Sequence, residues 1–174
     1  MTDWLRRAGR GLFPDGRTLL WSVAEGRRGR RWRSSTIDPD GRLVLALLYE
    51  ESAEGRFTRL ELVNATGMLT LHPESDGARV DGNVVGVAGV RPISLPWAPD
   101  FVLIVPDSPI PEILTRRAIP TGRKVSAALV IAGDLSIRSD PSLAGQGTGP
   151  AADDRGVPEL TSPSEWALED DAAP

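Results

Sequence analysis

The chain has 174 residues, a hydrophobic share of 40% and a formal net charge of -4 at pH 7, a profile that suits one folded domain with a terminal tail. It contains no cysteine and a single histidine, His72, which excludes disulfides and thiolate metal sites and disfavours a serine–histidine–acid triad. The charge is uneven, because residues 1–33 carry nine arginines against three acids and residues 139–174 carry eight acids against one arginine.

Residues 1–17 form a predicted N-terminal segment with a short helix over residues 4–9. Asp3 is a suitable N-cap, and Gly9 or Gly11 would end the helix. The segment lacks the apolar core of a signal peptide, and no stretch reaches the roughly 18 apolar residues needed to span a bilayer. We therefore expect a cytoplasmic protein without a transmembrane segment.

Residues 18–138 form the predicted main domain, and their pattern is that of β-structure. Strands are predicted at residues 19–23, 30–37, 43–49, 56–63, 68–71, 80–87, 101–105 and 125–137. Residues 43–49 are nearly all apolar, which predicts a central strand buried on both faces. Strict alternation in residues 56–63 predicts that the side chain of Phe57 lies on the other face of the strand from the side chains of Leu60 and Leu62. Turn-forming residues between the strands, such as Asp38-Pro39-Asp40-Gly41, favour an antiparallel meander.

Two regions depart from this pattern. Residues 91–120 contain seven prolines, a density that only edge strands, bulges and loops tolerate. Residues 139–174 form a predicted acidic linker and flexible tail. Within the tail, Ser162, Pro163 and Glu165 are typical of a helix start, so a short helix is predicted over 163–170.

Few polar clusters suggest chemistry. The arginines at 27, 28, 30, 31 and 33 flank Trp32, and we interpret them as a solvated hairpin edge or as a patch for an anionic headgroup or the acidic tail. The acidic net charge and scarce aromatic residues disfavour nucleic acid. His72 beside Glu74 is interpreted as a strand-end histidine. Ser108 has no histidine near it in sequence, so no catalytic, metal or cofactor site is predicted.

The apolar strands greatly outnumber the helices available to cover them. Such a sheet must curl, either into a packed barrel or roll or around a space for an apolar ligand. The predicted fold class is therefore all-β: a curled antiparallel sheet, either a β-roll or an open barrel, with a short N-terminal helix and a flexible C-terminal tail.

The order of features over residues 56–137 adds a family resemblance. Strands at 56–62 and 67–71 precede an Asp76-Gly77 turn, a second Asp-Gly pair within 80–84, an apolar strand running into Ser108-Pro109-Ile110, the pair Arg116-Arg117, Gly122 and a last apolar strand. This order resembles bacterial glycolipid-binding proteins with a spiral β-roll fold. The family's Thr-Asn-Thr run after the serine–proline pair is replaced here by Pro111-Glu112-Ile113. The resemblance implies a curled sheet around a hydrophobic groove, with a lipid or glycolipid as ligand.

The predicted function is non-enzymatic binding of an apolar or amphiphilic, glycolipid-like small molecule inside the curled sheet. The alternative is a structural or interaction module with a filled core, whose acidic tail docks on the basic patch. A homodimer through a sheet edge is also considered. The residues predicted to contact the ligand are Leu45, Leu47, Leu60, Leu62, Leu69, Leu71, Phe101, Leu103, Arg116, Arg117, Leu129 and Ile131, with the two arginines meeting a polar head.

Overall fold

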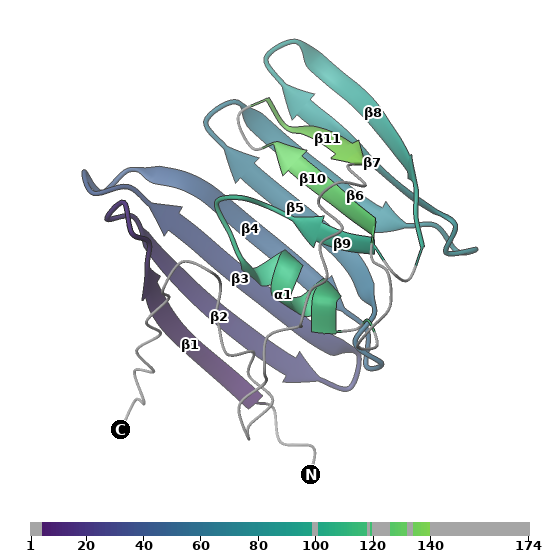
Figure 1. Ribbon diagram of the computed structural model, residues 1–174, viewed down its shortest axis with the longest axis horizontal. Helices are drawn as coiled ribbons and strands as arrows, with labels where there is room; N and C mark the ends of the chain where they lie inside the picture. Colours follow the sequence, from purple (N-terminus) through teal and green to yellow (C-terminus); the bar gives the residue numbers. More distant parts are fainter. Residues whose placement is uncertain (1–4, 99–100, 118, 120–125, 132–133, 140–174) are drawn as a thin grey trace.

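The computed structural model describes residues 5–98, 101–117, 119, 126–131 and 134–139, and these form two layers (Figure 1). The first layer is one sheet of β1 (Leu5–Leu12), β2 (Thr18–Gly26), β3 (Gly29–Ile37), β4 (Leu43–Glu51), β5 (Phe57–Asn64), β6 (Gly67–Pro73), β7 (Arg79–Gly86) and β8 (Gly89–Pro96). The second contains β9 (Phe101–Ile104), α1 (Ile110–Arg117), β10 (Ser126–Ile131) and β11 (Ser136–Ser139). Among these residues no helix is long and apolar enough to cross a bilayer.

The large sheet is an open antiparallel meander in which each strand pairs with the next one in sequence. The predicted all-β, curled antiparallel sheet is confirmed, and β1 and β8 lie at its two edges. Pro92 and Pro96 both fall in β8, where a residue without an N–H removes no hydrogen bond on the solvent side. The proline-rich stretch therefore begins on an edge strand, as its composition indicates.

The predicted N-terminal helix is wrong over the described residues, because residues 5–12 form strand β1. β1 pairs with β2 in continuous register from Leu5 opposite Glu25 to Leu12 opposite Thr18. Two glycines lower the helical preference of this segment, and the sheet edge supplies partners for its backbone groups. Gly9 also fits beneath the indole of Trp21, where an added Cβ would lie 2.7 Å from the ring.

The strand predicted at 43–49 is buried on one face only. Leu45, Leu47 and Tyr49 of β4 are 1–4% exposed on the inner face, whereas the side chains between them are only partly buried. The prediction of burial on both faces is therefore wrong, because the second layer covers one face of the sheet and the other meets solvent.

A β-bulge between β4 and β5 changes the direction of one side chain. Glu50 is opposite Arg59 and Glu51 is opposite Phe57, so Thr58 has no partner on β4. As a result Phe57 and Leu60 are both buried, although they are three residues apart. Strict alternation predicted Phe57 on the other face from Leu60, and that prediction is wrong.

The second layer covers the inner face of the sheet (Figure 1). β9 and β10 are parallel, and β10 pairs antiparallel with β11. Residues 125–137, predicted as a closing strand with a bulge or tight turn at Gly133-Asp134, therefore contribute to two antiparallel strands. Helix α1, which lies within the proline-rich stretch, was not predicted; its Pro111 occupies the first turn, where the missing N–H has no intrahelical partner to lose. Ser34 shares a hydrogen bond of 3.2 Å with Ser108, which ties the two layers together.

Candidate functional site

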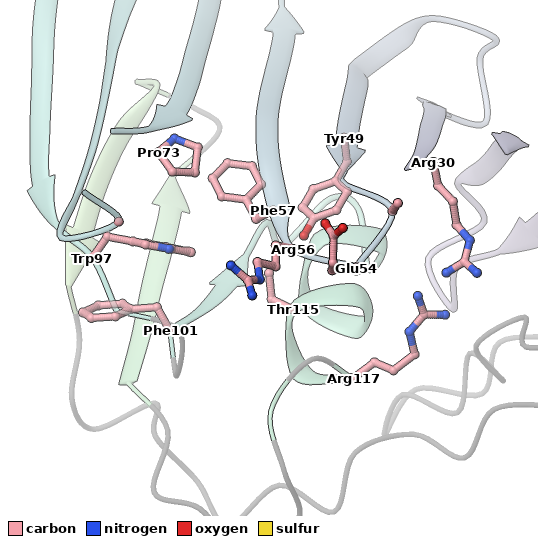
Figure 2. A pocket seen from close by; sticks show the side chains of 13 residues that line it. Arg30, Tyr49, Glu54, Arg56, Phe57, Pro73, Trp97, Phe101, Thr115 and Arg117 are labelled. Carbon is pink, nitrogen blue, oxygen red and sulfur yellow. The ribbon is translucent and has the colours of Figure 1, made fainter. Parts of the chain in front are cut away.

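A cavity of about 820 Å³ opens at the end of the sheet where β4 turns into β5. Its walls come from β3, β4, β5, the β4–β5 and β6–β7 turns, the segment after β8, β9 and α1 (Figure 2). Cavities that bind small molecules usually measure about 300–1,000 Å³. This one therefore has the size of a small-molecule site, and it is assembled from segments far apart in the sequence.

Four aromatic side chains form one wall of the cavity. Tyr49 stacks on Phe57 at 5.4 Å, Phe57 meets Trp97 at 5.5 Å, and Trp97 stacks on Phe101 at 5.3 Å between ring centroids. Such contacts fix the rings, because each aromatic pair contributes about 0.5–1.5 kcal/mol beyond burial alone. The result is a rigid apolar wall, and Phe57 joins it because of the β-bulge.

A buried carboxylate holds two arginines on the other side. The side chain of Glu51 is fully buried, and its Oε1 accepts hydrogen bonds from Arg30 at 3.2 Å and Arg117 at 3.3 Å. Arg30 also pairs with Glu25 at 3.1 Å, and the Glu25 hydrogen bond is the largest contribution that raises the pKa of Arg30. Glu51 Oε2 has no partner among the described residues. Arg30 and Arg117 line the cavity, so Glu51 fixes two of its cationic groups from behind.

The β4–β5 turn supplies a third arginine and an acid. The Ser52 hydroxyl donates to Glu54 at 2.6 Å, and this bond is the largest cause that lowers the pKa of Glu54. The guanidinium of Arg56 forms no hydrogen bond or ion pair with any described residue. Figure 2 shows it near the middle of the cavity on the side of Trp97 and Phe101, while Arg30 and Arg117 face each other across from it.

Tyr49 provides a spectroscopic reporter of this site, because it is the only tyrosine in the chain. Burial raises the pKa of its hydroxyl well above the ordinary value, the charge of Glu51 adds to this, and Arg117 opposes it. In an alkaline titration followed by ultraviolet absorbance, we expect no phenolate near pH ~10, where a free tyrosine is half ionised.

The same shift predicts a loss of stability at high pH. Because the pKa of Tyr49 is higher in the folded protein than in the unfolded chain, the free energy of unfolding is unaffected at pH values below the pKa of the unfolded chain. Above about pH 10 it should fall by about 1.4 kcal/mol per pH unit, since only the unfolded chain loses the proton. Tryptophan fluorescence recorded in parallel reports whether the protein is still folded. Phenolate formation at about pH 10 with native fluorescence would contradict the burial of Tyr49.

The sequence-predicted ligand residues divide into four groups. Phe101 and Arg117 line the cavity. Arg116 instead pairs with Glu112 at 2.9 Å along α1. The side chains of Leu129 and Ile131 lie outside the described part of the structure. The remaining seven are packed in the core, 0–4% exposed, and are not among the residues that line the cavity: Leu45, Leu47, Leu60, Leu62, Leu69, Leu71 and Leu103.

Sequence reasoning missed most of the cavity wall. Tyr49 and Glu51 continue the inward alternation of Leu45 and Leu47, so extending that pattern by one step would have placed both inside. The position of Phe57 in the wall depends on the bulge. Trp97 lies among prolines, where the sequence shows no hydrophobic periodicity. Neither carries a local signal of its position.

The other polar candidates occupy structural positions. Ser108 is 0% exposed and shares a hydrogen bond with Ser34, so substrate has no access to its hydroxyl. His72 lies 3.7 Å from Glu74 on an exposed part of β6. No group of three or more His, Cys, Asp or Glu side chains lies close enough together, within the described ranges, to hold a metal ion.

The basic patch of β3 is partly neutralised by its neighbours. β3 lies inside the sheet between β2 and β4, so its interpretation as a hairpin edge is wrong. The register places Arg30 beside Glu25 and Glu51, and Arg31 pairs with Glu50 at 2.5 Å. The acidic tail and the helix predicted at 163–170 lie outside the described residues.

Comparison with known proteins does not add to this site: no protein-family model, curated protein or solved structure matches the chain.

Proposed function

We propose that the protein binds an apolar or amphiphilic small molecule, without catalysing a reaction, in the cavity between β4, β9 and α1. The observation that carries the proposal is a cavity of about 820 Å³ with an aromatic wall on one side, Arg30 and Arg117 on the other, and Arg56 near the middle on the side of Trp97 and Phe101 (Figure 2). Apolar walls supply affinity, and a few fixed polar groups orient a ligand. A molecule with an apolar body and a polar head matches both sides.

The family resemblance in the sequence supports a glycolipid-like molecule as the ligand. The proposed binding site differs from the one expected from the sequence. The leucines of the sheet centre pack against the second layer, so the space available to a ligand lies at one end of the sheet. The apolar part of the ligand would lie along Phe57, Trp97 and Phe101.

Filling the cavity tests this proposal. Ala53 is an exposed residue of the β4–β5 turn that lines the cavity, so Ala53→Trp adds a large side chain there without removing core contacts. We expect the neutral dye N-phenylnaphthylamine to bind the unmodified protein saturably with enhanced fluorescence. In the variant, its affinity should fall by about tenfold or more, equivalent to about 1.4 kcal/mol.

Ala65→Trp is the matched control. Ala65 is also exposed, and it lies in the turn at the opposite end of β5, away from the cavity lining. This variant should bind the dye as the unmodified protein does. Equal affinity in all three proteins, or no saturable binding in any of them, would refute the proposed site.

The packed core favours a second candidate function, a structural or interaction module. Leu60, Leu62 and Leu69 are 0% exposed, as expected for an interior that is filled rather than hollow. In this alternative a second copy would pair with β1, because the other edge strand carries Pro92 and Pro96. Absence of dye binding in the experiment above would favour this alternative.

A further inference from the structure

The three arginines that line the cavity differ in how they are neutralised. Arg30 pairs with Glu25 and Glu51, and Arg117 pairs with Glu51. The guanidinium of Arg56 forms no hydrogen bond or ion pair with a carboxylate among the residues that the structure describes. Its charge acts on Glu54, but only as the smallest cause that lowers the pKa of that carboxyl, so the lining holds one guanidinium whose N–H donors are left for a ligand.

The local structure of the turn explains why Glu54 forms no hydrogen bond with Arg56, although the Arg56 charge contributes to lowering the Glu54 pKa. The carboxylate of Glu54 accepts the Ser52 hydroxyl, and the Ser52 Oγ in turn accepts the backbone N–H of Glu54 at 3.2 Å. The backbone N–H of Ser52 donates to the carbonyl of Arg56 at 2.8 Å, which closes the turn. Glu54 is thus held by Ser52, and the backbone of Arg56 is fixed at the mouth of the cavity.

The position of Arg56 beside an aromatic wall defines the ligand it suits. Guanidinium groups bind carboxylates and phosphates through paired N–H donors, and these charge-assisted hydrogen bonds are about twice as strong as neutral ones. A neutral polar head would leave the N–H donors of Arg56 without a charged acceptor.

We infer that the ligand is an anionic amphiphile, with a carboxylate or phosphate head bound by Arg56 and an apolar body against Phe57, Trp97 and Phe101. This inference rests on the proposed function and names the chemistry of the head. Arg30 and Arg117 border the head site, with their charges offset by Glu25 and Glu51. The inference is specific, because it ranks charged heads above sugar and alcohol heads of equal chain length.

Competition against bound N-phenylnaphthylamine tests the inference with four ligands that share a ten-carbon chain. Decanoate and decyl phosphate carry anionic heads, whereas decanol and decyl glucoside carry neutral ones. At least one anion should displace the dye at about tenfold lower concentration than either neutral ligand, as expected for one charge-assisted contact. The stronger anion identifies the head. Inorganic phosphate alone should not displace the dye, because it lacks an apolar body.

Two glutamine variants provide the decisive comparison. In Arg56→Gln the advantage of the anions over decanol should disappear. Arg59→Gln is the matched control, because Arg59 lies three residues further along the chain on β5, pairs with Glu61 and is absent from the cavity lining. It should keep the full preference. High salt should also reduce the preference in the unmodified protein.

The failures of the two proposals are distinguishable. If neutral and anionic ligands displace the dye equally, or if Arg56→Gln keeps the preference, the anionic head is refuted and the proposed binding function stands. If no ligand and no dye binds, the proposed function fails as well.

Discussion

Replacing Gly82 with alanine is expected to lower the free energy of unfolding by about 3 kcal/mol or more. Gly82 lies on the inner face of β7, opposite Leu71 of β6. A Cβ at this position would lie 1.8 Å from the carbonyl oxygen of Thr70, and this obstacle is backbone that cannot rotate away. The two strands would have to separate, which would break hydrogen bonds of the ladder in the middle of the sheet.

Gly86→Ala on the same strand is the control for this prediction. An added Cβ there would meet only the Thr66 carbonyl oxygen, at 3.3 Å, which a small backbone adjustment relieves. Urea unfolding followed by tryptophan fluorescence compares the three proteins. Gly82→Ala should unfold at much lower urea or be unfolded already, with Gly86→Ala near the unmodified protein. Equal midpoints for the two variants would contradict the close approach of β6 and β7.

Removing both arginines that face Glu51 is expected to have a comparably large effect. The double variant Arg30→Gln with Arg117→Gln leaves a fully buried carboxylate without a cation. Breaking a buried ion pair from one side typically costs about 3–5 kcal/mol, because a charge remains out of water without a partner. Adding Glu51→Gln removes that charge, so the triple variant should recover much of the lost stability.

The exposed pair of Arg31 with Glu50 is the control for this cycle. It lies on the same two strands, and the Arg31 side chain is 56% exposed. Arg31→Gln should change the free energy of unfolding by no more than about 1 kcal/mol, because water solvates both charges. Thermal or chemical unfolding of the unmodified protein and the three variants measures the cycle. A triple variant no more stable than the double variant would show that Glu51 does not depend on its arginines.

The sequence alone predicted the β-rich fold and its main antiparallel arrangement. Local signals were sufficient there, because turn residues mark the ends of strands and alternation marks the face that is buried. Ser34 and Thr36 on β3 and the leucines of β5 and β6 follow that alternation, and the structure buries them. Proline density limited residues 91–120 to edge strands, bulges and loops, and the structure places Pro92 and Pro96 on the edge strand β8, which was not itself predicted.

Predictions from local sequence patterns were wrong where contacts between distant residues stabilise the local structure. Residues 5–12 carry a plausible helix cap, yet they form β1 because the open edge of β2 satisfies their backbone groups. Phe57 enters the cavity wall through a bulge that depends on how β5 registers against β4. Helix α1 forms within a proline-rich stretch because packing against β9 stabilises it, including the hydrogen bond from the Leu103 N–H to Thr115 at 3.0 Å.

The sequence by itself therefore determined the β-rich character of the chain and the inward-facing leucines of β4, β5 and β6, but not the strands β1 and β8 or the face on which Phe57 lies. It did not determine the site, because the cavity brings together Arg30, Tyr49, Arg56, Trp97 and Arg117 from five separate segments. These residues come together because the sheet curls, β5 contains a bulge and α1 packs on β9. Each of these features depends on contacts between residues far apart in the chain. The pairing of Arg30 and Arg117 with buried Glu51 arises only when those segments pack together.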